Sequence, residues 1–132
     1  MVTLNDNRLI GNCPPRMLHE EGMQFWKWAR LSECHGASSL EENGSIVAFC
    51  RWSRRYREDG GIHLNGTWKA SHITDRGVPQ KLLESVLKST GADTVSVYTT
   101  SQQGYDWILR MKNIYNHIHW IHTDVMDFEI FG

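Results

Sequence analysis

The hydrophobic pattern of the chain changes period several times, and each change marks a predicted element. Alternation in Thr94–Tyr98 is typical of a half-buried strand, whereas Ser45–Tyr56 begins with an apolar run that favours burial on both faces. Asn43-Gly44 is a hairpin signal before that strand, and Asn65-Gly66 suggests a bulge in the next one. The pattern predicts strands at residues 2–10, 37–40, 45–56, 62–73, 94–98, 114–122 and 125–131.

A period near 3.6 residues predicts three helices. The clearest begins after Thr74 or Asp75, either of which can cap it, and ends at Gly91. A second begins at a Ser101 cap and continues through Lys112, with one face made by Tyr105, Ile108 and Leu109. An earlier helix is expected from Arg16 to about His35. The order of elements predicts one α/β domain covering residues 1–132.

Composition narrows the class of protein. The 132 residues suit a single domain, and 40% hydrophobic with 22% charged residues allow a core in a soluble chain. The formal net charge of −1 gives no overall field that would attract nucleic acid or an anionic membrane. No apolar run is long enough to span a membrane, and the N-terminus lacks a secretion signal, so a cytoplasmic location is expected. The three cysteines have no CxxC spacing, which disfavours a disulfide framework or a cysteine zinc site.

The strand, loop and helix start in Trp68–Leu83, together with the element order, resemble the GNAT superfamily of acyltransferases that use acetyl-CoA. The resemblance runs from about Glu33 to Gly132. It implies a central, twisted, mixed and mostly antiparallel sheet flanked by helices, with acetyl-CoA as cofactor. The family's pyrophosphate loop reads Arg or Gln, two residues, Gly, one residue, then Gly or Ala. Here the loop is the degenerate Arg76-Gly77-Val78-Pro79.

The resemblance also implies functional residues. Ser101 occupies the position of a family asparagine, and Ile108 occupies that of the tyrosine acid, so Tyr105 one turn earlier is the candidate acid. His72 is the candidate base beside the acetyl group, although a hydrogen-bonded structural histidine is the plainer interpretation. Cofactor contacts are expected at Ala70, Ser71, Ile73, Arg76, Gly77, Val78, Gln80 and Ser101.

Three segments narrow the resemblance to short GNAT-like proteins of tailed bacteriophages. These are Leu31–Cys34, Thr67–Lys69 and Ser101–Tyr115. They imply a phage protein of the host cytoplasm or the virion. The alternative to an enzyme is an inactive GNAT-fold protein that binds a protein partner. An enzyme requires an open gap between strands 62–73 and 94–98, whereas a pure binder predicts a filled gap.

One basic stretch, residues 51–57, has a second candidate role. Its cations are expected to bind an acidic protein surface or, less favoured, single-stranded nucleic acid beside Trp52 and Tyr56. The alternative is an exposed strand end whose arginine stems cover apolar surface. A histidine pair, His117 and His119, shares a strand face but lacks an evident third ligand, so no metal is predicted. The candidate partner-binding residues are Arg51, Arg54, Arg55 and Arg57.

Overall fold

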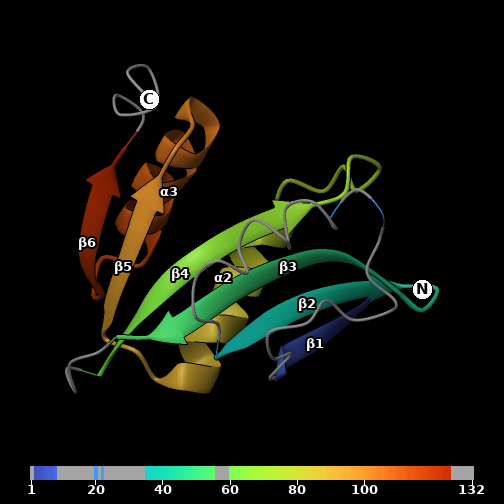
Figure 1. The fold of residues 1–132 in the computed structure, drawn as a ribbon, viewed down its shortest axis with the longest axis horizontal. Coiled ribbons are helices and arrows are strands. Elements are labelled where there is room, and N and C mark those ends of the chain that lie inside the picture. The colour runs from blue at the N-terminus through green and yellow to red at the C-terminus, as the bar shows by residue number, and fades with distance from the viewer. Residues whose placement is uncertain (1, 9–19, 21, 23–34, 56–59, 126–132) are drawn as a thin grey trace.

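A computed structural model describes residues 2–8, 20, 22, 35–55 and 60–125 (Figure 1). Within these residues six strands form one sheet in chain order, β1-β2-β3-β4-β5-β6. Pairing is antiparallel from β1 to β4 and parallel from β4 through β6. The single α/β domain with a mixed sheet is therefore confirmed. The strands are β1 (Val2–Arg8), β2 (Gly36–Glu42), β3 (Ser45–Arg54), β4 (Gly61–Lys69), β5 (Thr94–Thr99) and β6 (His119–Asp124).

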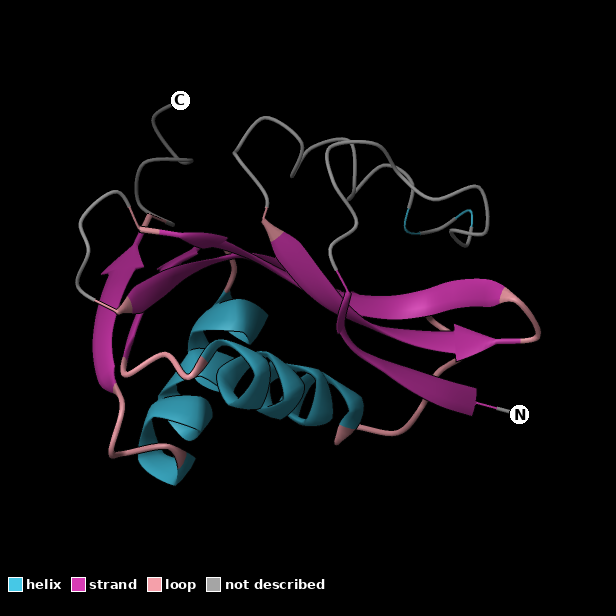
Figure 2. Ribbon diagram, turned by 90° about the horizontal axis from the view of Figure 1, so that it is seen from below, coloured by secondary structure: helices cyan, strands magenta, loops and turns pink. Residues whose placement is uncertain are grey.

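Two described helices, α2 (Val78–Thr90) and α3 (Gln102–Ile114), cover the same face of the sheet (Figure 2). One apolar stripe along α2 is buried, and its residues Leu82, Leu83 and Val86 are 0% exposed. These side chains share one core cluster with residues of β3, β4 and β5. Removing this stripe from water is the main force that holds α2 on the sheet.

Local signals in the sequence set the turns that bound these elements. Asn43 and Gly44 have φ values of 52° and 82°, the left-handed pair that a tight hairpin between β2 and β3 needs. Ser101 caps α3, because its Oγ accepts the amide hydrogen of Gly104 at 3.1 Å. Gly91 ends α2 at φ 64°, and its amide donates to the Leu87 carbonyl. The predictions for all three turns are confirmed.

Several element boundaries differ from the sequence prediction. β4 ends at Lys69 because the chain turns, with the Ile73 amide bonded to the Ala70 carbonyl at 3.0 Å. α2 has Gly77 as its cap residue, and Asp75 instead bonds the Gly77 amide. α3 extends to Ile114, so the strand predicted at 114–122 begins only at residue 119. In α3 the buried residues are Ile108 and Met111, while Leu109 is 44% exposed.

The predicted helix at residues 16–35 and the predicted strand at 125–131 lie almost entirely outside the described residues.

Replacing Gly91 with alanine is expected to destabilise the protein by about 1–2 kcal/mol, because an L side chain is strained at this left-handed position. No atom lies within 4 Å of the place where a Cβ would be, so the loss is conformational and not a steric clash. Urea unfolding measures this loss of stability. Gly91→Asn should lose less, since asparagine tolerates this backbone region. Equal stability of Gly91→Ala and the wild type would contradict this account.

Candidate functional site

β4 and β5 separate halfway along their length. Their last pair is Leu64 with Val97, after which β4 continues beside β3 and β5 continues beside β6. The bulge predicted at Asn65-Gly66 falls at this point, since the β3–β4 register shifts between the pairs Arg51–Gly66 and Trp52–Leu64. The gap that the sequence analysis required for an enzyme is therefore present.

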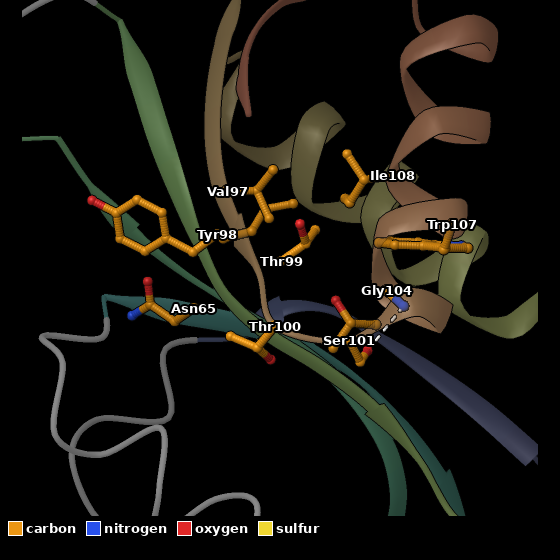
Figure 3. Close-up of a pocket in the computed structure, with 12 residues that line it drawn as sticks. Asn65, Val97, Tyr98, Thr99, Thr100, Ser101, Gly104, Trp107 and Ile108 are labelled. Carbon is orange, nitrogen blue, oxygen red and sulfur yellow. Dashed lines mark hydrogen bonds between the residues drawn. The ribbon is translucent and has the colours of Figure 1, made fainter. Parts of the chain in front are cut away.

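A cavity of about 180 Å³, called the slot below, occupies this gap (Figure 3). Its inner wall is apolar, with Val97 from β5 and Ile108 from α3, and Trp107 closes one side. Its outer rim is polar. The slot is lined by Leu64, Asn65, Gly66, Thr67, Val97, Tyr98, Thr99, Thr100, Ser101, Gly104, Trp107 and Ile108.

A larger hollow of about 680 Å³, called the basic groove below, continues from the slot to the start of α2. The two share Thr67, Ser101, Gly104 and Trp107, so they form one continuous depression. The basic groove is lined by Thr67, Trp68, Lys69, Arg76, Pro79, Ser101, Gln103, Gly104, Trp107 and Arg110.

The basic groove is suited to an anion. Lys69, Arg76 and Arg110 line it, and none of its described lining residues has a carboxylate. Lys69 also donates to the Ile73 carbonyl at 2.7 Å, which ties the loop after β4 to the groove wall. The N-terminal ends of both α2 and α3 reach the groove, through Pro79 and through Ser101 and Gly104. Helix N-termini add positive potential to that of the side chains.

These features fit acetyl-CoA, with one departure from an amide-rich phosphate loop. Asp75 accepts the amide hydrogen of Gly77 at 2.8 Å, the Val78 amide bonds the Asp75 carbonyl at 3.3 Å, and Pro79 has no amide hydrogen. The start of α2 therefore offers few amides, and Arg76 and Arg110 are the groove side chains that could bind phosphates. The apolar slot could hold the pantetheine arm and the thioester.

The structure separates the predicted cofactor residues into two groups. Arg76 and Ser101 line the groove. The other six do not line it. Ala70 and Ile73 are buried in the turn after β4, and Val78 is buried at the start of α2. Gly77 and Gln80 also lie at the start of α2, and Ser71 is exposed on the turn after β4. A role for any of them in binding stays a prediction.

The two predicted catalytic residues lie elsewhere. His72 sits on the turn after β4, where its Nε2 lies 3.1 Å from Glu42 Oε1, and it lines neither the slot nor the basic groove. Tyr105 packs against His122 with ring centroids 5.1 Å apart. β4 stops before reaching His72, so this histidine is not at a strand end, and its role as the catalytic base stays a prediction.

His122 connects Tyr105 indirectly to the slot. Its Nε2 lies 2.8 Å from the Thr99 hydroxyl, and Thr99 lines the slot. Burial lowers the pKa of His122, the Lys112 charge lowers it further, and the Asp124 charge opposes both. Tyr105 is thus two contacts away from the slot.

Sequence reasoning missed several wall residues, namely Asn65, Trp107 and Arg110. A signal for Trp107 was present: with Ser101 as cap, Gly104 and Trp107 follow at intervals of three and lie on one helix face. The bulge likewise pointed to Asn65, whose side chain accepts a hydrogen bond from Ser53 at 3.1 Å.

The basic stretch at residues 51–57 is not one exposed row. Arg51 is 0% exposed, so its assignment to a partner-binding surface is wrong: β3 is covered on both faces here. Arg54 is exposed and lies over the Trp52 ring, with its guanidinium 5.4 Å from the centroid. Arg55 is half-buried, and Arg57 lies outside the described residues. Partner binding by Arg54, Arg55 and Arg57 stays a prediction.

No group of three or more His, Cys, Asp or Glu side chains in the described part of the chain could hold a metal ion. No described helix is both long and apolar enough to cross a membrane.

Solved acetyltransferase structures have the same arrangement of elements. The IAA acetyltransferase from Bacillus cereus ATCC 14579 is 14% identical with a TM-score of 0.56, covering 86% of this chain and 75% of that chain. A GNAT-family acetyltransferase from Streptococcus pneumoniae TIGR4 is 13% identical with a TM-score of 0.57, covering 88% and 92%. AAC(6')-Iy, in complex with the bisubstrate analogue CoA-S-monomethyl-acetylneamine, is 12% identical with a TM-score of 0.50, covering 84% and 88%.

No protein-family model matches the chain, and no curated protein matches it in sequence. The likeness to solved structures at these identities shows the fold: this chain has the fold of the GNAT acetyltransferases.

Proposed function

We propose that this protein is a GNAT-type N-acetyltransferase that binds acetyl-CoA in the slot and the basic groove. The observation that carries the proposal is the separation of β4 and β5, which opens an apolar slot beside a groove whose described lining has three cations and no carboxylate. The fold is shared with acetyltransferases, and the chemistry is argued from the site because a fold alone does not determine function.

Acetyl-CoA, when bound, supplies an acetyl group activated as a thioester. Arg76 and Arg110 would bind its phosphates by charge-assisted hydrogen bonds. The apolar side chains of Leu64, Val97 and Ile108 would exclude water from the reacting carbon. An amine that reaches the open rim of the slot could then attack the carbonyl carbon directly, with no acylated protein intermediate.

Calorimetric titration of the purified protein with acetyl-CoA tests the proposal. We expect binding in the micromolar range, with CoA lacking the acetyl group also bound, because the phosphates make the charged contacts. Absence of binding at millimolar acetyl-CoA would refute the proposal.

A second part of the proposal concerns the source of this protein and its location. The segments similar to phage proteins support a phage-encoded protein of the host cytoplasm or virion. The alternative, an inactive protein of the same fold that binds a host or virion partner, predicts a filled gap. The open slot therefore favours the enzyme.

A further inference from the structure

His63 lies where β4 and β5 begin to separate. It pairs with Ser96 in the sheet register, and the following pair, Leu64 with Val97, is the last before the strands diverge. Leu64 and Val97 belong to the core cluster under the helices. Since side chains alternate along a strand, His63 and Ser96 lie on the opposite face of the sheet.

The slot reaches this opposite face. Asn65 and Tyr98 line the slot, each just beyond the last paired residue of its strand. The Tyr98 ring meets the His63 ring edge-on at 4.9 Å between centroids. Asn65 bonds Ser53, the residue paired with His63 across β3 and β4. His63 is therefore adjacent to the rim of the slot, on the side away from α2 and α3.

The imidazole of His63 is fixed in orientation. Its Nδ1 lies 2.8 Å from the Ser96 hydroxyl oxygen. Because the two ring nitrogens lie on opposite sides of the imidazole, this contact leaves Nε2 for another group. With the proton on Nδ1 donated to Ser96, Nε2 carries the free lone pair.

The surroundings keep His63 neutral near pH 7. Burial lowers the pKa of His63, and the positive charge of Arg55, from the end of β3, lowers it further. Tyr98 is the titratable side chain that faces it from β5. A neutral imidazole is the form that accepts a proton.

The geometry points to His63 as the catalytic base on the acceptor side of the slot, with Ser96 as its positioning residue. This inference rests on the proposed function. A primary amine enters from the face opposite the helices, and its nitrogen lone pair attacks the thioester carbonyl carbon. The C–N bond would form, one N–H proton would pass to His63 Nε2, and the C–S bond would break. The thiolate would leave and take a proton from solvent, and His63 would return its proton to solvent, so that the products are the amide and free CoA with the base regenerated.

The test measures acetyl transfer to spermidine, a lysine-containing peptide and an aminoglycoside, by release of the CoA thiol and by product mass. His63→Gln should lower kcat by about 10²- to 10⁴-fold, the range for loss of a general base. It should leave the calorimetric Kd for acetyl-CoA unchanged. Ser96→Ala should cause a smaller loss, because it removes only the contact that orients the ring.

Two further readouts separate catalysis from structure. In the wild type, kcat should fall as the pH drops through the lowered pKa of His63, because the protonated imidazole cannot accept a proton; His63→Gln should lack this limb. Added imidazole should restore activity to His63→Ala. An unchanged kcat and pH profile in His63→Gln would overturn the assignment.

The remaining outcomes separate the two proposals. A wild-type protein that binds acetyl-CoA yet acetylates none of the three amines would overturn the role of His63 and leave cofactor binding standing. A wild-type protein that fails to bind acetyl-CoA would overturn the proposed function itself.

Discussion

Reversing the charge of Arg76 and Arg110 together should abolish acetyl-CoA binding. Each guanidinium lines the basic groove, and the start of α2 offers few free amides to compensate for its loss. A hydrogen bond to a charged group contributes about 1.5–3 kcal/mol, which corresponds to about 10- to 150-fold in affinity. The double variant Arg76→Glu, Arg110→Glu should therefore weaken binding by at least about 100-fold, measured by calorimetry.

A matched control lies on α2, the helix that follows Arg76 in the chain. Lys88 is near the C-terminal end of α2, its side chain is 77% exposed, and it pairs with Glu84, so it is outside the groove. Lys88→Glu, compared with the single variant Arg76→Glu, makes a charge change of the same size. If Lys88→Glu weakened acetyl-CoA binding as much as Arg76→Glu, the loss of affinity would come from the overall charge of the protein and not from a specific phosphate site.

Elements with strong local signals could be predicted from the sequence. The apolar stripe of α2, its end at Gly91 and the Asn43-Gly44 hairpin all depend on residues close together in the chain. Each element is fixed by backbone preferences and by one buried face, which a single sequence records directly. The order of these elements was enough to predict the fold.

The composition of the groove could not be predicted in the same way. Lys69 and Arg110 are 41 positions apart, as the difference of their numbers shows. They line one groove only because the fold brings the end of β4 and the helix α3 together. No local pattern records that approach. The sequence identified Arg76 because it lies in the loop that resembles the family's pyrophosphate loop, and Ser101 because it caps a helix. It missed Arg110 because an arginine within a helix has no local signature.

His72 and His63 show how the predicted end of a strand determines which residue is chosen as the candidate base. Extending β4 to Ile73 placed His72 at the strand end and made it the candidate base. The strand stops at Lys69, so His72 lies on a turn beside Glu42, while His63 takes the position where the strands separate. Similarly, Arg51 and Trp52 are adjacent and both buried, so alternation along β3 could not identify an exposed basic row.

Replacing Leu82 with alanine should have the largest effect on stability. Leu82 is 0% exposed and lies in the core cluster between α2 and the sheet. A buried Leu→Ala change costs about 2–5 kcal/mol, from lost burial and from the cavity that remains. The whole domain is expected to have only about 5–15 kcal/mol of stability, so this one change removes a large share.

Urea unfolding of Leu82→Ala and Leu109→Ala compares the same substitution in two environments. Leu109 is 44% exposed on α3, so its replacement should change the free energy of unfolding by about 0.5 kcal/mol or less. Because Arg76 lies in the loop directly before α2 and lines the basic groove, a partly unfolded Leu82→Ala protein should bind acetyl-CoA only in its folded fraction. Saturating acetyl-CoA should then raise the urea midpoint of Leu82→Ala. Equal losses in the two leucine variants would show that α2 is not held by the burial of its apolar stripe.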